Sequence, residues 1–324
     1  MIVFLLLILL WVIGVFTLLL FAGFLFEQYS RRKLERKIFK RKTFADIDGK
    51  KLHYVKKGKG NCTVVFQSGM GSSHAIWHEI QEAISQNAVT ISYDRNGIML
   101  SEATGKTVTN DHVSKERELL LENTHCPKPY ILVGHSMAGI YLRPFIKRHE
   151  YDIAGIVFAE AAHPKQIEMA SPELLKTLKI PPHQLIKFLV QTGIYRILFS
   201  FIPLSPEIPV RHRLHRMEKN FFYRSCNKVL EELKNDRHNF KDAEEYNSFG
   251  NIPLTIITGT SEIRYAKIKN AGLKNELRQL TEKVQLDLLK LSSNSRLVKA
   301  ENSGHILQIN DAELFVSEIQ SLYC

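Results

Sequence analysis

The segment Tyr130–Gly139 constrains the fold more than any other part of the chain. An apolar strand pattern, Tyr-Ile-Leu-Val, runs into Gly-His-Ser-Met-Ala-Gly and then directly into a helical pattern. Such a tight strand–turn–helix needs small residues two positions before and after its serine, because the two backbones pass close together, and Gly134 and Ala138 supply them. The turn would expose Ser136 at the N-terminus of a helix, where free N–H groups favour a developing oxyanion.

Short apolar runs of strand length alternate with helical patterns after residue 43. A hairpin is expected at 45–55, with Asp48-Gly49 as its turn. The further expected strands are 63–67, 89–93, 130–133, 153–159, 254–258 and 295–299, and the expected helices between them are 76–84, 114–121, 137–149 and 280–291. This order predicts an α/β fold with a mostly parallel, doubly wound sheet that carries helices on both faces.

The stretch between the strands at 153–159 and 254–258 is far longer than the roughly one dozen residues that a crossover needs. Its helical patterns, joined by prolines, predict an inserted helical cap or lid at 164–250, with the core at 44–163 and 251–324. The cap contains an apolar stretch at 185–202 that charged residues interrupt. We expect this stretch to line an acyl or alkyl pocket rather than to cross a membrane.

An apolar run from Ile2 to Phe26 precedes these elements, and only two glycines and one threonine interrupt it. As a helix it would reach about 37 Å, enough to cross the ~30 Å hydrocarbon layer. No basic residue precedes Ile2, and bulky residues occupy the position of a cleavage site, so an uncleaved transmembrane anchor at 1–26 is expected rather than a signal peptide.

The net charge of +11 is concentrated behind this run. Residues 1–42 hold eight basic and two acidic side chains, and a basic juxtamembrane linker is therefore expected at 27–43. The positive-inside rule then predicts a single-pass membrane protein with the rest of the chain in the cytoplasm, and the basic cluster suits anionic headgroups. Because the remaining charge is spread over a long chain, it gives no indication of nucleic-acid binding.

A nucleophilic serine needs a general base, normally a neutral histidine oriented by a carboxylate. His305 follows the expected strand 295–299, in the loop Ser303-Gly304-His305, and precedes a final helical pattern. A histidine on a loop late in the chain fits the order serine, acid, histidine that the Ser136 turn requires. We therefore expect His305 to be the base.

Four segments in the same order now identify a resemblance: from about residue 44 to its end, the chain resembles the α/β-hydrolase superfamily. Phe66–Trp77 resembles the oxyanion loop of that family, although Gln67-Ser68 replaces the commoner histidine. Tyr93–Ser101 resembles its Asp-Arg-x-Gly-x-Gly-x-Ser turn, with Met99 at the second glycine. The Ser136 turn, with Ala138 where glycine is usual, and the His305 loop complete the set.

The resemblance implies a hydrolase that uses a serine–histidine–acid triad, with oxyanion donors in the backbone N–H groups of Met70 and Met137. Most members place the acid after the strand that corresponds to 254–258, which would be Glu262 here, and a minority place it one strand earlier. There Glu160 lies in a segment that resembles the Val-Asp-Ala-Ala-His-Pro turn of some lipases and esterases. Glu160 is the preferred acid and Glu262 the alternative. A serine nucleophile also argues against epoxide hydrolase or haloalkane dehalogenase chemistry, for which this family uses aspartate.

The function expected from these observations is a membrane-anchored serine hydrolase that cleaves a carboxylic ester of an apolar small molecule or lipid, or else a thioester or amide, through an acyl-enzyme. The alternative is a catalytically weak sensor or protein-interaction domain at the membrane, which the departures at Gln67, Met99 and Ala138 permit. The oligomeric state is left open.

No cofactor or metal is expected. The four cysteines form no CxxC pair, and His74 and His78 lack a third ligand in sequence. The glycine pattern at 69–71 imitates a dinucleotide fingerprint but lacks its third glycine.

Overall fold

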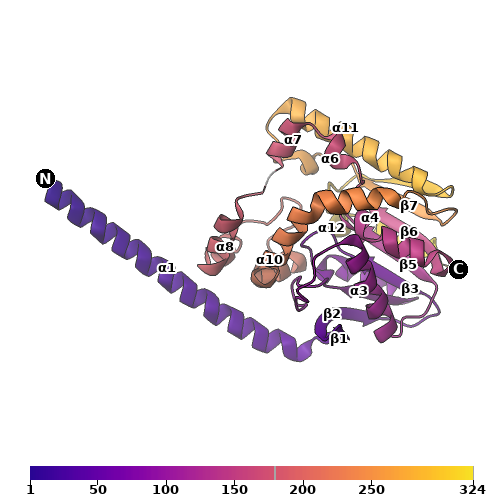
Figure 1. The fold of residues 1–324 in the computed structure, drawn as a ribbon, viewed down its shortest axis with the longest axis horizontal. Coiled ribbons are helices and arrows are strands. Elements are labelled where there is room, and N and C mark those ends of the chain that lie inside the picture. The colour runs from indigo at the N-terminus through magenta and orange to yellow at the C-terminus, as the bar shows by residue number, and fades with distance from the viewer. Residues whose placement is uncertain (179, 324) are drawn as a thin grey trace.

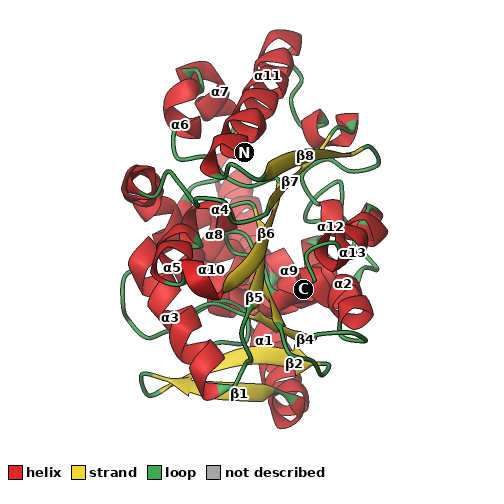
Figure 2. Ribbon diagram, turned by 90° about the vertical axis from the view of Figure 1, so that its right-hand side faces the viewer, coloured by secondary structure: helices red, strands yellow, loops and turns green. Residues whose placement is uncertain are grey.

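The computed structural model describes residues 1–178 and 180–323, and it contains one eight-stranded sheet with the order β1-β2-β4-β3-β5-β6-β7-β8. The sheet twists strongly from the β1–β2 end to the β7–β8 end (Figure 2). The strands are β1 (Thr43–Ile47), β2 (Lys50–Lys57), β3 (Thr63–Gln67), β4 (Val89–Tyr93), β5 (Tyr130–His135), β6 (Ile153–Ala159), β7 (Leu254–Gly259) and β8 (Ser295–Ala300).

Strands β3 to β8 run parallel to one another, whereas β2 is antiparallel to both β1 and β4. The expected hairpin is confirmed, and its turn residues Asp48 and Gly49 have positive φ angles of 54° and 74°. Because parallel strands end at one edge of a sheet, the loops after β3, β5, β6, β7 and β8 all lie at that edge. The expected mostly parallel, doubly wound α/β sheet is therefore confirmed.

Helices cover both faces, and alternate side chains of each strand point to opposite faces. In β5, Leu132 packs into a core with helices on one side, whereas Ile131 and Val133 pack into the core on the other. The first face carries α3 (Asn110–Asn123), α4 (Ala138–Tyr141), α5 (Arg143–Arg148) and α11 (Ala271–Leu288), and the second carries α2 (His78–Ile84), α12 (Leu307–Asn310) and α13 (Ala312–Gln320).

The N-terminal helix α1 (Ile2–Ile38) is continuous and extends away from the rest of the chain (Figure 1). It contains a segment long and apolar enough to cross a membrane, and none of that segment is buried against the protein. The basic stretch that we expected as a linker continues the same helix instead. Its last turns reach the protein body, where Leu34, Ile38 and Phe39 pack against Ile98 and Phe221.

Residues 160–253, between β6 and β7, are mainly helical. They contain α6 (Gln166–Met169), α7 (Pro172–Thr177), α8 (His183–Gln191), α9 (Ile194–Leu198) and the long α10 (Arg213–Asp242). We call residues 164–250 the insertion. The apolar stretch at 185–202 is divided between α8 and α9 at Gly193, whose φ of 74° ends the first helix. Helices α8 and α10 of the insertion lie between α1 and the sheet, whereas α6 and α7 lie beside α11 (Figure 1).

We predict that Trp77 is a principal contributor to stability. Its fully buried ring lies 5.2 Å from the ring of Phe66 and 5.8 Å from that of Phe315, between strand β3 and helix α13. Trp77→Ala should lower the free energy of unfolding by about 3–5 kcal/mol, because it leaves a cavity in a close-packed core. Urea unfolding of the detergent-solubilised chain measures this change. Tyr151, 96% exposed, is the control, and Tyr151→Ala should stay within about 0.5 kcal/mol of the original protein.

Candidate active site

Ser136 lies in a strained turn between β5 and α4. Its φ is 55°, which a non-glycine residue rarely adopts. Its N–H donates to the carbonyl of Ala159 at 3.1 Å, which fixes the turn against the end of β6. A Cβ on Gly134 would lie 2.9 Å from the Cβ of Ala138, so the small residues that the sequence pattern required do lie in contact.

The structure brings Ser136, His305 and Glu160 together at the carboxyl edge of the sheet. The Oγ of Ser136 lies 3.2 Å from Nε2 of His305, and Nδ1 of His305 lies 3.5 Å from Oε2 of Glu160. These residues follow three different strands, β5, β8 and β6, and the sequence order is serine, acid, histidine. The first distance is a hydrogen bond, and the second is at the long limit of one.

Glu160 is buried, with a positive φ of 47°, and its carboxylate has several partners. Oε1 accepts hydrogen bonds from the hydroxyl of Thr258 at 2.9 Å and from the N–H of Gly259 at 2.8 Å. Oε2 faces His305 and also forms an ion pair with Arg264, in the 3-10 helix η5 (Glu262–Tyr265) after β7. Two donors from β7 thus fix the carboxylate, and its free oxygen is shared between an imidazole and a guanidinium.

The structure does not bring Glu262, the alternative acid, to His305. Glu262 is exposed and pairs with Arg278 of α11 at 2.5 Å. The loop after β7 contributes Arg264 instead of an acid. Of the two carboxylates that the sequence left open, the histidine therefore contacts Glu160.

The electrostatics around His305 favour a neutral imidazole. Its partial burial, and next the nearby guanidinium of Arg264, lower the pKa of His305 below its ordinary value, whereas Glu207 acts in the opposite direction. The adjacent His135 is buried, and burial likewise lowers its pKa. A neutral Nε2 is able to accept a proton from the Ser136 hydroxyl.

The loop with Met70 lies against the serine turn, since a Cβ on Gly69 would be 2.9 Å from the Cβ of Ser136. Met70 also packs against the cluster that includes Met137. Among the described residues, neither the Met70 N–H nor the Met137 N–H donates a hydrogen bond to the protein. The segments that carry both sequence-predicted oxyanion donors therefore lie beside Ser136, and no described residue accepts a hydrogen bond from either N–H group.

A buried ion pair holds this loop in place. Arg95 donates to the carbonyls of Ser68 at 2.7 Å and Gly69 at 3.0 Å, and it pairs with Glu232 at 2.8 Å. The other oxygen of Glu232 accepts from the N–H of Gly71 at 3.1 Å. Because Glu232 belongs to α10, the insertion helps to shape the loop.

Glu207 connects the insertion to the histidine loop. Its carboxylate accepts hydrogen bonds from the N–H of Gly304 at 3.1 Å and of Ile306 at 2.9 Å, on either side of His305. On the other side of the loop, His135 Nε2 lies 2.8 Å from the His305 carbonyl oxygen. Sequence reasoning missed Glu207, Glu232 and Arg264. Of these three residues, only Arg264 lies near a candidate from the sequence, because it follows the alternative acid Glu262 by two positions.

A cavity of about 320 Å³ opens above Ser136 and His305. Its other walls are mainly apolar, with side chains of α6, α7, the residue after α7, and α11, namely Ile167, Leu175, Leu178, Leu277, Leu280 and Val284. The stretch at 185–202, which we expected to line an acyl or alkyl pocket, does not contribute to this lining. That expectation is wrong because α8 and α9 pack toward α1: the 2.9 Å bond from Arg31 to the Val190 carbonyl is one of those contacts.

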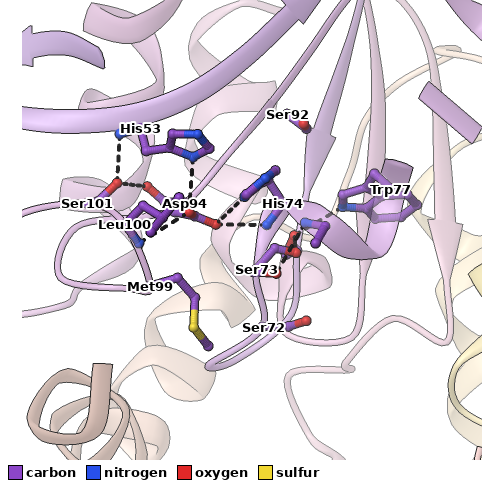
Figure 3. Close-up of polar contacts among 12 residues, drawn as sticks. His53, Ser72, Ser73, His74, Trp77, Ser92, Asp94, Met99, Leu100 and Ser101 are labelled. Carbon is purple, nitrogen blue, oxygen red and sulfur yellow. Dashed lines mark hydrogen bonds and ion pairs between the residues drawn. The ribbon is translucent and has the colours of Figure 1, made fainter. Parts of the chain in front are cut away.

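His53, His74 and Asp94 form a buried cluster whose donor atoms are close enough for a metal ion (Figure 3). Their hydrogen bonds account for the arrangement without one. Asp94 accepts from Nδ1 of His53 at 3.1 Å, from Nδ1 of His74 at 2.9 Å, and from the N–H groups of His74 and Leu100. Burial raises the pKa of Asp94, but the charges and hydrogen bonds of His74 and His53 outweigh it and hold this pKa well below its usual range. The cluster connects β2 and β4 to the end of the Met70 loop.

Comparisons with known proteins agree with this architecture. No protein-family model matches the chain. The uncharacterized protein YqjL of Bacillus subtilis is 24% identical over 86% of this chain and 90% of its own length. A Gibberella zeae protein named as an AB hydrolase superfamily protein is 22% identical over 80% of this chain and 85% of its own length.

Solved structures match over larger parts of the chain. Est816, described as an N-acyl homoserine lactone degrading enzyme, has a TM-score of 0.62 and 16% identity, covering 87% of this chain and all (100%) of its own. A membrane phospholipase A, described as a bacterial virulence factor, has a TM-score of 0.63 and 16% identity over 99% of this chain and 98% of its own. Together with the strand order and the serine turn, these likenesses show that this protein has the α/β-hydrolase fold.

Proposed function

We propose that this protein is a serine hydrolase that cleaves a carboxylic ester through an acyl-enzyme. The observation that carries the proposal is the chain of contacts from Ser136 Oγ to His305 Nε2 at 3.2 Å, and from His305 Nδ1 to Glu160 at 3.5 Å, beside an apolar cavity. A nucleophile, a neutral base and a carboxylate in this order are the parts that acyl transfer requires.

In this mechanism His305 takes the hydroxyl proton of Ser136 as Oγ attacks the ester carbonyl. The carbonyl oxygen becomes an oxyanion that accepts hydrogen bonds from the Met70 and Met137 N–H groups. The oxyanion then collapses, the C–O bond to the alcohol breaks, and His305 returns its proton to the leaving alkoxide. A water molecule, deprotonated by His305, cleaves the acyl–serine bond in the same way. Glu160 orients the imidazole and stabilises its protonated form.

The apolar walls of the cavity favour an ester with an apolar acyl or alcohol group. Est816 and the phospholipase, by their descriptions, act on a lactone and a phospholipid, which both contain an ester bond. The fold also occurs in an epoxide hydrolase and a haloalkane dehalogenase. A serine at position 136 supports acyl transfer for this chain rather than those two reactions.

The proposal includes a single membrane span at the start of α1, with the hydrolase portion on the cytoplasmic side. It is supported by the apolar N-terminal helix and by the basic residues that follow its apolar part. The phospholipase that matches nearly the whole chain is described as a membrane protein.

Ser136→Ala should lower kcat/KM for p-nitrophenyl esters by at least about a thousandfold, because the nucleophile is removed. The same variant should lose labelling by a fluorophosphonate probe, which requires an activated serine. Retained labelling would contradict the assignment. If the original protein hydrolysed no ester of a short- to long-chain series and took up no probe, the sensor or interaction alternative would be favoured.

Replacement of each carboxylate by its amide separates the two acids. Glu160→Gln should reduce kcat by about 10³–10⁴-fold, since an amide neither orients the imidazole tautomer nor stabilises imidazolium. Glu262→Gln removes an exposed ion pair and should change kcat by less than about twofold. Thermal unfolding of both variants tests whether the loss at Glu160 is a loss of structure. The opposite ranking would assign the role to Glu262.

The pH profile reports the charge on His305. Because the surroundings lower the pKa of His305, the acid limb of kcat/KM should lie below pH 6.5. Arg264→Leu removes a cation that disfavours the imidazolium form of His305. The substitution also leaves the Glu160 carboxylate free to pair with that imidazolium. Both effects raise the pKa, so the limb should move to higher pH by about one unit. If the midpoint of the acid limb did not move, even with a change in the maximal rate, Arg264 would not control the pKa of His305.

A further inference from the structure

The exposed apolar side chains of the protein body are strongly concentrated. Among the described residues after α1, ten large hydrophobic side chains are exposed, and eight of them fall within residues 178–202. They are Leu178, Ile180, Leu185, Phe188, Ile197, Leu198, Phe201 and Ile202, which we call the apolar face of the insertion. Phe201 is 80% exposed. Clusters of this kind on a protein surface mark contact with a partner or a membrane.

The apolar face is held against α1 at a defined position along that helix. A Cβ on Gly23 would lie 2.4 Å from the carbonyl oxygen of Thr192, and one on Gly193 would lie 2.8 Å from the carbonyl oxygen of Gly23. The turn between α8 and α9 therefore touches the backbone of α1. Gly23 precedes Phe26, the last residue of the apolar run, by only about 4.5 Å of helix rise. The turn thus contacts α1 where its apolar run ends.

Charges at this contact are paired within the protein. Glu27, the first acidic residue of the chain, is buried and pairs with Arg31 at 2.8 Å and with Arg196 of α9 at 2.6 Å. No unpaired carboxylate of Glu27 thus faces a hydrocarbon layer, where it would be costly. Beyond the contact, α1 exposes cations, namely Arg32, Lys33, Arg36 and Lys37. Lys219 of α10 adds one more, and its ammonium donates at 3.1 Å to the hydroxyl of Ser200, two residues after the end of α9.

We infer that the apolar face of the insertion is embedded in the same bilayer leaflet that α1 enters, and that the ester substrate reaches the cavity from that leaflet. The partner is a lipid bilayer because the face is continuous with a helix whose apolar part is long enough to span one, and because cations suited to anionic headgroups lie on its water side. This inference rests on the proposed hydrolase function for the second of its two statements.

Leu178 connects the face to the cavity. It lines the cavity that contains Ser136 and His305, and it is also 49% exposed. Ile180 follows it two residues later, and Leu185 begins the exposed side of α8. These apolar side chains form the described part of a route from the acyl chains to the serine that suits an apolar ester. A cavity with this entrance selects lipophilic esters that partition into membranes.

The first experiment measures depth in the full chain reconstituted into phosphatidylcholine vesicles. Phe201→Trp, in a Trp11→Phe background, reports on the face. Tyr151→Trp in the same background is the matched control, since Tyr151 is 96% exposed but lies outside the face. The fully buried Trp77 is present in both variants, so its emission is subtracted with the Trp11→Phe protein alone. Replacing part of the lipid by 6,7-dibromophosphatidylcholine should quench the tryptophan at 201 and leave that at 151 unchanged.

Emission from position 201 that bromolipid leaves unquenched and iodide quenches would overturn the embedding. A blue-shifted emission that bromolipid does not quench, and that depends on protein density, would assign the face to contact between two copies and would also overturn it.

The second experiment tests delivery. Leu185→Ser with Phe188→Ser changes the face without touching the cavity lining. Hydrolysis of p-nitrophenyl palmitate within vesicles should fall at least about tenfold, while hydrolysis of water-soluble p-nitrophenyl butyrate should stay unchanged. Equal changes for both esters would contradict delivery from the bilayer. If the original protein cleaved neither ester, the proposed hydrolase function would fail, and the quenching at position 201 would still decide the embedding.

Discussion

The site depends on the strained turn that holds Ser136 between β5 and α4. A φ of 55° is unfavourable for serine, and the turn is stable only because Gly134 and Ala138 let strand and helix approach. The N–H of Ser136 in this turn donates a hydrogen bond to the carbonyl of Ala159 at the end of β6, where Glu160 begins the next loop. The Met70 loop packs against it from the other side. The turn thus fixes the position of Ser136 relative to the other groups of the site.

The insertion is part of this site rather than a separate cover. Glu232 of α10 neutralises Arg95 beneath the Met70 loop, and Glu207 holds two N–H groups beside His305. Both carboxylates are buried, so loss of either would leave a buried cation or donors without a partner. Movements of the insertion would therefore change the geometry of the base and of the oxyanion loop together. A membrane contact at α8 and α9 would also act on the insertion, since both helices belong to it.

Local patterns allowed much of the fold to be predicted. The Ser136 turn and the position of His305 could be predicted because each is defined by a short sequence motif, and the motifs occur in a fixed order along the chain. The strands could be predicted because they are short apolar runs. Glu160 and Glu262 both follow strand ends, and the sequence preferred Glu160 only because its turn resembles that of some lipases and esterases. The separation depends on Thr258 and Gly259 donating to one carboxylate across 98 and 99 residues. Glu207 and Arg264 act through similarly long-range contacts, and the packing of α8 on α1 was not predicted for the same reason.

The central claim is that the Oγ of Ser136 is the atom that becomes acylated. Tandem mass spectrometry of proteolytic peptides, after the protein reacts with a fluorophosphonate, locates the covalent bond directly. We expect a single adduct on Ser136, absent from protein denatured before the reaction, since the free hydroxyl is a weak nucleophile without His305. An adduct on a different residue, or equal modification of the denatured chain, would contradict it.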